Sequence, residues 1–310
     1  MQPDVTFIIA AWKAADTLPA ALHSALAQEG VSVECVVADD CSGDGTADAA
    51  RAIGDARIKV VSLEENGGPG AARNAAMRLA TGRWLAVLDC DDSVRPDRLA
   101  RMIARGERMD AAIVVDNIEI AENGRSHPMF PEALLRRTPD ISLEAFILSN
   151  RMFRSRFNFG YMKPIVRNDF VRQHDIRYPD GLRIGEDFIF LASAMAHGGR
   201  CVVEPETGYV YAVRQGSISR VLHAHHVEAL IAADAAFLAA HRLSGPERAA
   251  MAAHRKSLDD AAAFLEVVRH IKDRSIGGAL KQGLANPMAL AHLRMPIAAR
   301  LQRLARPAAG

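Results

Sequence analysis

The sequence predicts an α/β fold, in which a mostly parallel sheet is flanked by helices and followed by a helical C-terminal region. Two observations lead to this prediction. Over residues 5–115, short apolar runs rich in β-branched residues alternate with segments of helical spacing, which is typical of a parallel sheet covered on both faces. Over residues 222–271 the spacing is helical, apart from one break.

The elements follow in order along the chain. Strands are predicted at 5–12, 33–38, 58–63, 84–88 and 111–115, with helices at 16–28, 47–53 and 71–80 and another that starts at Pro96. Short helices are predicted at 142–149, 168–174 and 185–197, and two strands at 201–204 and 208–213. The break in the C-terminal helices runs from Ser244 to Glu247 and predicts an N-cap with a capping box.

Composition limits the class of protein. The 310 residues include 38 basic and 37 acidic side chains, so no global positive field argues for nucleic acid as a partner. The four cysteines are scattered without a C-x-x-C pair, which indicates free thiols in a reducing compartment and no zinc site. The apolar run at 5–12 is too short for a membrane span or a signal-peptide core. We expect a cytoplasmic protein.

Paired aspartates follow two of the predicted strands. Asp39-Asp40 follows the second strand, and Asp89-Cys90-Asp91-Asp92 follows the fourth. Ligands of open α/β sheets bind outside the carboxyl ends of the strands. Oxygen ligands suit magnesium or manganese, and such an ion would neutralise a diphosphate. An acidic turn at a helix N-terminus explains the second cluster equally well, and a helix-capping turn explains the first.

Three further motifs also have both a chemical and a structural interpretation. The loop 66–74 (NGGPGAARN) would let the backbone approach a phosphate and Arg73 add a positive charge, but a tight strand-to-helix turn needs the same glycines. Gly185-Glu186-Asp187 provides either a general base or ordinary helix capping. Arg214, in the segment 209–219, provides either a clamp for a diphosphate or part of an edge strand and polar turn.

Taken in order, these motifs resemble those of the family 2 glycosyltransferases, which have the GT-A fold of nucleotide-diphospho-sugar transferases. The shared features are the opening strand, D-D-x-S-x-D-G-T at 39–46, N-G-G-x-x-x-A-R-N at 66–74, L-D-x-D-D at 88–92 and G-E-D at 185–187. The resemblance covers residues 4–220. Within the family the chain looks most like bacterial exopolysaccharide glycosyltransferases of the succinoglycan type.

The resemblance implies a domain organisation and a set of donor contacts. Residues 1–220 would form the catalytic domain, with a nucleotide-binding half at 1–117 and an acceptor-binding half at 118–220, and residues 221–310 a helical C-terminal region. Asp39 would bind the uracil ring, and Asp89 would lie near the ribose and the metal. Asp91 would hold Mn²⁺ or Mg²⁺ on the donor diphosphate, with Asp92 supporting it.

The resemblance also implies the reaction. Asp187 would be the catalytic base, with Glu186 beside it, and Arg73 and Arg214 would contact the diphosphate. The base would take the proton of an acceptor hydroxyl, whose oxygen displaces the nucleotide in one inverting step. The donor would be a UDP-sugar carrying a hexose, glucose in particular. The acceptor would be a lipid-linked saccharide in exopolysaccharide or other surface polysaccharide biosynthesis.

Some positions depart from the family pattern. The first strand of family members usually ends in Pro-x-Tyr-Asn, where this chain has Ala10-Ala11-Trp12-Lys13, so the contact of this loop with the nucleoside is not implied. Cys41 stands where glycine is common and Cys90 where serine is common. Neither replacement removes a carboxylate, so the implied chemistry is kept.

Two other functions are compatible with parts of this pattern. A sugar-phosphate nucleotidyltransferase also uses an α/β sheet and carboxylate-bound magnesium, but it needs a glycine-rich loop after the first strand, and residues 10–17 contain no glycine. A non-catalytic sugar-nucleotide-binding protein would not need both Asp91 and Asp187. An assay of donor hydrolysis distinguishes this alternative from an enzyme.

The C-terminal tail has a basic amphipathic pattern. Residues 276–310 contain no acidic residue. The basic residues of this tail are Lys281, Arg294, Arg300, Arg303 and Arg306, and its helically spaced apolar residues are Leu290, Leu293, Ile297, Leu301 and Leu304. Such a segment can lie on an anionic membrane surface, in which case the protein is peripheral at the inner face of the cell membrane. A helix packed on its own domain explains the same pattern, and Pro287 and Pro296 predict two short segments.

Overall fold

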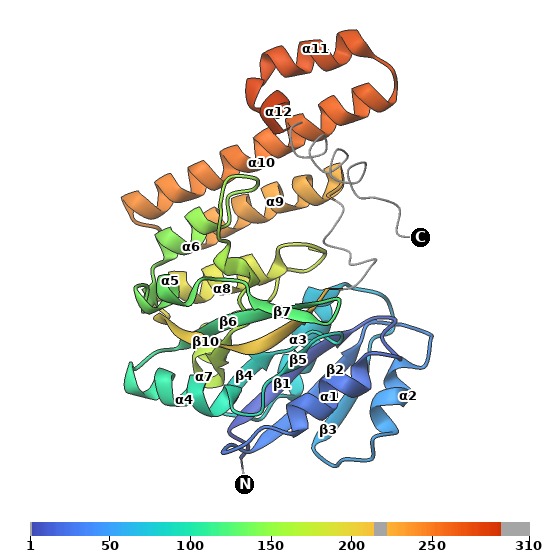
Figure 1. Cartoon of the computed structure of the whole chain (residues 1–310), viewed down its shortest axis with the longest axis vertical. Helices are drawn as coiled ribbons and strands as arrows, with labels where there is room; N and C mark the ends of the chain where they lie inside the picture. The colour runs from blue at the N-terminus through green and yellow to red at the C-terminus, as the bar shows by residue number, and fades with distance from the viewer. Residues whose placement is uncertain (1, 214–221, 293–310) are drawn as a thin grey trace.

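The computed structural model describes residues 2–213 and 222–292, which form one mixed sheet, the helices around it and a helical C-terminal region (Figure 1). The strands are β1 (Val5–Ala11), β2 (Val33–Asp39), β3 (Ile58–Ser62), β4 (Trp84–Val87), β5 (Ser93–Val94), β6 (Ile113–Glu122), β7 (Arg125–Pro128), β8 (Asp140–Ile141), β9 (Ile165–Arg167) and β10 (Cys201–Ala212).

The helices alternate with the first strands and then dominate the chain. They are α1 (Leu18–Leu26), α2 (Thr46–Arg51), α3 (Pro69–Leu79), α4 (Arg98–Arg108), α5 (Glu132–Arg136), α6 (Leu143–Ser149), the 3₁₀ turn η1 (Phe159–Tyr161), α7 (Asn168–Gln173), α8 (Glu186–Ala196), α9 (Ala224–Ala240), α10 (Gly245–Lys272), α11 (Ile276–Ala285) and α12 (Pro287–His292). The predicted helices and the first four predicted strands are confirmed, with boundaries shifted by a few residues.

The strand order is β3-β2-β1-β4-β9-β6-β10-β5 among the described residues. Neighbouring strands among β1 to β4 pair in parallel, and so do β6 and β10. The short strand β9 lies between β4 and β6 and is antiparallel to both. The sheet is therefore mostly parallel, as predicted, although its middle strand was not anticipated.

Two predictions about strands are corrected. The strands expected at 201–204 and 208–213 are one continuous strand, β10, whose register with β6 shifts between Glu204 and Tyr209. Pro205 and Gly208 look like a turn in the sequence, but a bulge absorbs them because β6 continues alongside. The strand expected at 111–115 also runs on to Glu122, since the polar residues Asp116 and Asn117 are buried inside the fold.

The core occupies both faces of the sheet. Val5, Phe7 and Ile9 of β1 pack with α1 and α4 on one face, whereas Ile8 packs with α3, α6 and α8 on the other. Successive side chains of a strand point to opposite faces, and a parallel strand covered on both faces therefore reads as a continuous apolar run.

The C-terminal helices pack on the second face. Buried residues of α9 and α10 belong to the same apolar cluster as α3, α6 and α8. The predicted capping box is confirmed: the amide of Ser244 donates to Glu247, and the amide of Glu247 donates to the Ser244 hydroxyl. The boundary near residue 220 stays a prediction.

Helices α11 and α12 lie at the far end of α10 (Figure 1), where Ala289 packs on Phe264 and Val267. The chain breaks between these helices next to Pro287, as predicted. The predictions made for Leu293, Arg294, Pro296, Ile297, Arg300, Leu301, Arg303, Leu304 and Arg306 lie outside the described residues. Within the described ranges, no helix is both long and apolar enough to cross a membrane.

Candidate functional site

The predicted site residues gather at the carboxyl ends of β1, β2 and β4. Ala11, the last residue of β1, is paired in register with Asp39 at the end of β2, and Asp89 follows β4 on the other side of β1. Parallel pairing brings these three ends to one edge of the sheet. The aspartates that are 50 residues apart in sequence therefore face one region, as the sequence predicts.

The two aspartates after β2 have different environments. Both carboxylate oxygens of Asp40 accept hydrogen bonds from the amides of Gly67 and Gly68, at 2.8 and 2.9 Å. Those two loop amides hold Asp40, so they are not directed at a phosphate. Asp39 is also buried, but its Oδ1 accepts no hydrogen bond from any described residue. A buried acceptor without a donor lowers the stability of the fold. Of the two aspartates, Asp39 is therefore the one whose free acceptor atom can be satisfied by an N–H group of a ligand.

The loop after β1 is held by the 39–46 turn. The Ser42 hydroxyl accepts from the amide of Lys13, and the Thr46 hydroxyl accepts from the amide of Ala14, each at 2.9 Å. These bonds fix the position of Trp12, which is 44% exposed and has the Lys13 ammonium 4.7 Å from its ring centroid. Trp12 directly follows Ala11, which pairs with Asp39, and an exposed aromatic ring is a surface on which a base can stack.

A buried cluster of charges joins four of the predicted residues. Arg73 of α3 is 4% exposed. Its Nη2 lies 2.8 Å from Asp89 Oδ1, and its Nη1 lies 2.7 Å from Glu186 Oε1 and 3.0 Å from Asp187 Oδ1. Lys163, which the sequence analysis did not single out, completes the cluster: its Nζ lies 2.8 Å from Asp89 Oδ2 and 3.0 Å from Asp187 Oδ2.

Asp89 and the two cations of the cluster keep their charges despite their burial. Burial alone would raise the pKa of Asp89, but Lys163 and Arg73 hold that pKa below its usual range. Burial alone would lower the pKa of Lys163, yet Asp187 and Asp89 raise it above its usual value. Burial and the neighbouring charge of Asp187 raise the pKa of Glu186. Two permanent cations therefore face three carboxyl groups.

The turn after β4 is braced from β10. The Tyr209 hydroxyl donates to Asp92 Oδ2 at 2.7 Å and accepts from the amide of Asp89 at 3.0 Å, and the amide of Ala212 donates to Asp92 Oδ1. Burial, together with the charge of Asp89, raises the pKa of Asp92 to about 7. Both oxygens of Asp92 thus hold the turn in place.

The turn fits a divalent ion only if the substrate supplies most of the ligands. In the described part of the chain, no three His, Cys, Asp or Glu side chains converge as a metal site. Asp89 is ion-paired, Asp92 is hydrogen-bonded, and Asp91 is half-buried in the same turn. Magnesium is often held by one or two carboxylates together with substrate phosphates, and Asp91 fits that arrangement.

The turn before α8 is shaped by Gly185. Its φ is +85°, in the left-handed region, and it precedes α8, whose first two residues are Glu186 and Asp187. Glu186 is buried and bonded to Arg73. Asp187 is less buried, and its Oδ1 accepts no hydrogen bond from the described residues.

The structure therefore brings together Arg73, Asp89, Glu186 and Asp187, with Asp39, Asp91 and Asp92 along the same edge. Arg214 lies outside the described residues. Sequence reasoning missed Lys163 and Tyr209. The only local signal for Lys163 was a lysine inside the apolar stretch Tyr161–Val166, which is unusual unless the charge is paired.

Comparisons with known proteins agree with this description. Residues 6–170 match the family model described as Glycosyl transferase family 2. The chain is 54% identical over 304 residues to the succinoglycan biosynthesis protein ExoO of Rhizobium meliloti (strain 1021). The aligned region covers 98% of this chain and 87% of that protein.

Solved structures share the fold. The structure of S. aureus TarS in complex with UDP-GlcNAc matches with a TM-score of 0.65 and 19% identity over 89% of each chain. The mannosyltransferase PcManGT from Pyrobaculum calidifontis, in complex with GDP-Man and Mn²⁺, matches with a TM-score of 0.60 and 19% identity over 97% of this chain and 81% of that one. These matches confirm the predicted GT-A fold. The chain belongs to glycosyl transferase family 2.

Proposed function

We propose that this protein is an inverting glycosyltransferase that moves a hexose, glucose in particular, from a UDP-sugar to a hydroxyl of a lipid-linked saccharide. The observation that carries the proposal is the shared ion-pair cluster. Arg73 and Lys163 each contact both Asp89, on the donor side, and Asp187, the candidate base. A base and a donor site must be this close for direct transfer between two bound substrates.

The nucleoside end of the donor lies along the β1 and β2 ends in this proposal. Oδ1 of Asp39 accepts the ring N–H of uracil, and the exposed ring of Trp12 stacks on the base. The unpaired state of Asp39 Oδ1 supports this assignment. The neighbour TarS was solved with UDP-GlcNAc, which agrees with a UDP-sugar donor.

The diphosphate lies at the turn after β4. Asp91 would hold Mn²⁺ or Mg²⁺ against the diphosphate, with Asp89 and Asp92 beside it, and the ion would neutralise the charge that develops on the leaving group. The neighbour PcManGT was solved with Mn²⁺. Arg73 and Arg214 are proposed to orient the diphosphate; Arg73 is buried next to Asp89.

The transfer needs one displacement. Asp187 takes the proton of the acceptor hydroxyl while its oxygen bonds to the anomeric carbon. The bond from that carbon to the diphosphate breaks, and its electron pair leaves with the nucleotide, so the configuration inverts. Glu186 holds Arg73 in place beside the base.

We further propose that the reaction belongs to the synthesis of a succinoglycan-type exopolysaccharide at the inner face of the cell membrane. The identity of 54% to ExoO over nearly the whole chain supports this pathway. Membership of family 2 favours a transferase over a sugar-phosphate nucleotidyltransferase. The remaining alternative, a non-catalytic sugar-nucleotide-binding protein, is decided by assay.

The experiment is a donor screen. The purified protein is incubated with UDP-glucose, other UDP-hexoses and GDP-mannose in the presence of Mn²⁺, and the release of nucleotide is measured. We expect turnover of a UDP-sugar that EDTA abolishes and that Mn²⁺ or Mg²⁺ restores, and we expect Asp91→Ala to lose it. Full turnover in EDTA would contradict the metal assignment, and no turnover of any donor would favour the non-catalytic alternative.

A further inference from the structure

Lys163 is a buried cation placed between the two functional sides of the site. It precedes β9 in an irregular segment, is 9% exposed and donates a hydrogen bond to Asp187 Oδ2 while pairing with Asp89 Oδ2. We propose that Lys163 is a positioning residue for sugar transfer: its ammonium anchors Oδ2 of Asp187 and so fixes the orientation in which this carboxylate receives the proton of the acceptor. This inference rests on the proposed function, in which Asp187 is the base.

The two oxygens of Asp187 differ in a way that supports this role. Oδ2 accepts the Lys163 hydrogen bond at 3.0 Å. Oδ1 is buried and accepts no hydrogen bond within the described chain, although Arg73 Nη1 lies 3.0 Å away without hydrogen-bond geometry. A carboxylate anchored through one oxygen presents the other in a defined direction, which is what general-base catalysis requires. Lys163 on Oδ2 and Arg73 beside Oδ1 therefore fix the orientation of the Asp187 carboxylate.

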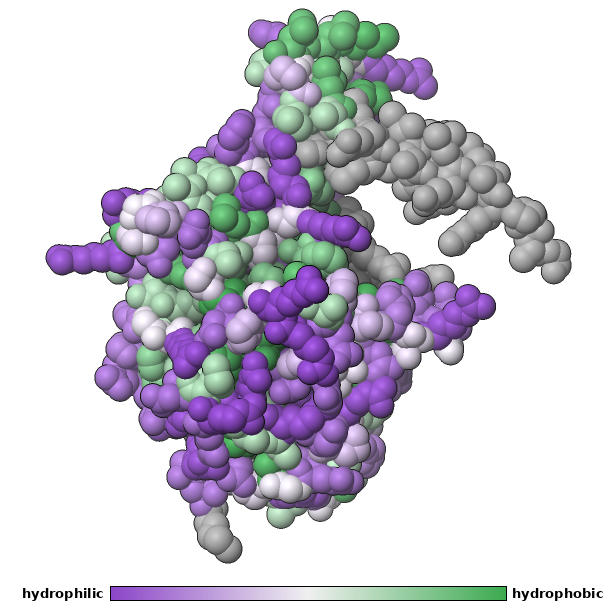
Figure 2. All heavy atoms as spheres, turned by 60° about the vertical axis from the view of Figure 1, so that its left-hand side comes forward, coloured by the Kyte–Doolittle hydropathy of each residue, from purple (hydrophilic) through white to green (hydrophobic). Residues whose placement is uncertain are grey.

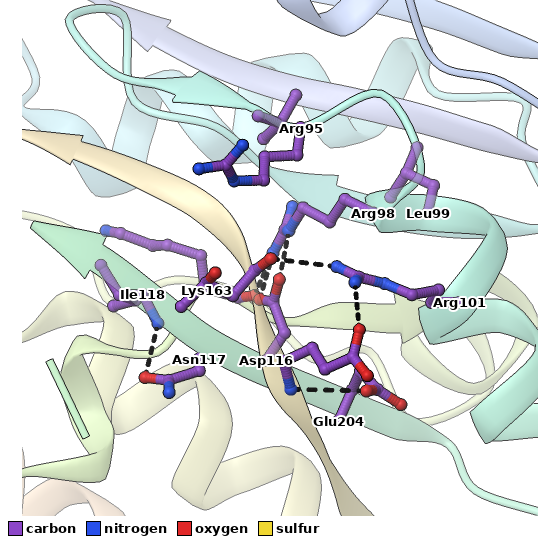
Figure 3. Close-up of polar contacts among 12 residues, drawn as sticks. Arg95, Arg98, Leu99, Arg101, Asp116, Asn117, Ile118, Lys163 and Glu204 are labelled. Carbon is purple, nitrogen blue, oxygen red and sulfur yellow. Dashed lines mark hydrogen bonds and ion pairs between the residues drawn. The ribbon is translucent and has the colours of Figure 1, made fainter. Parts of the chain in front are cut away.

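The backbone of Lys163 is itself fixed by a buried ion pair (Figure 3). Arg98 of α4 donates to both oxygens of Asp116 on β6, at 2.8 and 2.9 Å, and to the carbonyl oxygen of Lys163 at 2.6 Å. Arg98 and Asp116 are both 0% exposed. The rigid guanidinium thus connects α4, β6 and the segment before β9 at one point.

Arg98 also supports the turn after β4. Its guanidinium carbon lies 5.3 Å from the ring centroid of Tyr209, whose hydroxyl holds Asp92 and the amide of Asp89. Gly208 makes room for this packing, because a Cβ there would lie 2.4 Å from Asp116 Oδ2 and 2.6 Å from Arg98 Cγ. Arg98 and Asp116 therefore set the relative position of Lys163 and the turn after β4.

A merely structural lysine would behave differently. If Lys163 only balanced the charge of the buried carboxylates, its loss would lower stability and affect transfer independently of Asp187. If it acts through Asp187, its loss changes turnover only while Asp187 is present. A double-mutant cycle on turnover separates these two cases.

The test uses UDP release from UDP-glucose with Mn²⁺, water serving as the acceptor, or the UDP-sugar that the donor screen identifies. Lys163→Met keeps the length of the side chain and removes its charge. We expect kcat to fall by at least ~10-fold, toward the ~10²-fold that a misplaced group costs, with the donor KM changing less than ~3-fold. Lys163→Arg, which keeps the charge, should recover part of kcat.

The matched control is Lys59→Met. Lys59 also pairs with a buried carboxylate, at 2.7 Å from Glu34 Oε2, but on β3 and β2 away from the charge cluster. It should leave kcat unchanged. In the cycle, Lys163→Met combined with Asp187→Asn should be no slower than Asp187→Asn alone.

The inference is overturned if Lys163→Met keeps full kcat, or if the two losses in the cycle multiply. If Lys163→Met does not fold, the cycle is measured with Lys163→Arg. The inference is then overturned if the losses of kcat caused by Lys163→Arg and Asp187→Asn multiply in the double variant. Absence of donor turnover by the unmodified protein would instead refute the proposed function, so the two failures are distinguishable.

Discussion

Asp187 and Glu186 are adjacent in sequence but differ in what surrounds them. Glu186 is buried and accepts a hydrogen bond from Arg73, and leaving such a buried polar group without its partner typically costs about 1–3 kcal/mol of stability. Asp187 keeps one oxygen without a hydrogen bond. We therefore expect mutations of Glu186 to act mainly on folding and mutations of Asp187 mainly on turnover.

The Asp187→Asn variant tests the base. The amide keeps the shape of the side chain but cannot take a proton, so kcat should fall by ~10²–10⁴-fold. Affinity for UDP should change little, because Asp187 acts on the acceptor. The control is Asp180→Asn, an exposed aspartate seven residues earlier, which should keep normal turnover. Near-normal transfer by Asp187→Asn would show that another group is the base.

The Asp39→Asn variant tests recognition of the nucleoside. Oδ1 of Asp39 is buried without a partner, so it can accept the ring N–H of uracil, whereas an asparagine can turn an N–H donor toward it. We expect UDP binding to weaken by about 1–3 kcal/mol, the usual effect of leaving a buried polar group unsatisfied. Calorimetry with UDP and GDP measures this, and tighter binding of GDP than UDP by the unmodified protein would contradict the assignment.

At the scale of elements, α9 packs directly on the turn before Glu186 and Asp187. A Cβ on Gly185 would lie 2.4 Å from Cδ2 of Leu230, a core residue of α9. This contact explains why a glycine is needed at the turn beyond its left-handed φ of +85°. It also means that the helices after residue 222 help to shape the site.

A pair of glycine variants isolates that contact. Gly181 also has a positive φ, of +74°, but an added Cβ there meets nothing within 4 Å. Gly181→Ala should lower the free energy of unfolding by about 1–2 kcal/mol through backbone strain alone. Gly185→Ala should lower it by a further 1–3 kcal/mol or so, through overpacking against Leu230. Urea denaturation measures both; equal losses would show that α9 does not constrain the turn.

At the scale of the whole molecule, the end formed by α11 is hydrophobic (Figure 2). Ile276, Leu280 and Leu284 recur every four residues on α11 and are 75%, 58% and 78% exposed. Residues at this spacing share one helix face. Lys281 lies on the same helix, and residues 276–310 contain no acidic side chain. We propose that this face contacts the anionic inner surface of the membrane.

Vesicle co-sedimentation tests that contact. The intact protein should bind anionic vesicles at low salt and be released at high salt, since each basic residue near the surface contributes about 1 kcal/mol. Leu280→Gln together with Leu284→Gln should weaken binding without loss of stability, because both side chains are exposed. Leu79→Gln, an exposed leucine on α3, is the control. If the intact protein stays in the supernatant at low salt, the proposal that the α11 face binds the membrane is wrong.

The sequence by itself determined the first half of the sheet and the donor edge of the site. Continuous apolar runs predicted β1 to β4, and a parallel arrangement of these strands was enough to place Asp39 and Asp89 at one edge. The capping box at Ser244 was also predictable, because both partners lie within four residues. Each of these signals comes from residues that are close together in sequence, so the order and spacing of those residues is enough to predict it.

Only the tertiary structure decided what surrounds those aspartates. Tyr209 reaches the amide of Asp89 across 120 residues of sequence, and Arg73 reaches Glu186 across 113. The insertion of the short strand β9 between β4 and β6 brings Lys163 between Asp89 and Asp187. No periodicity encodes such contacts, because they depend on how segments remote in sequence pack against each other, and that packing decides which oxygens of these acids have a hydrogen-bond partner.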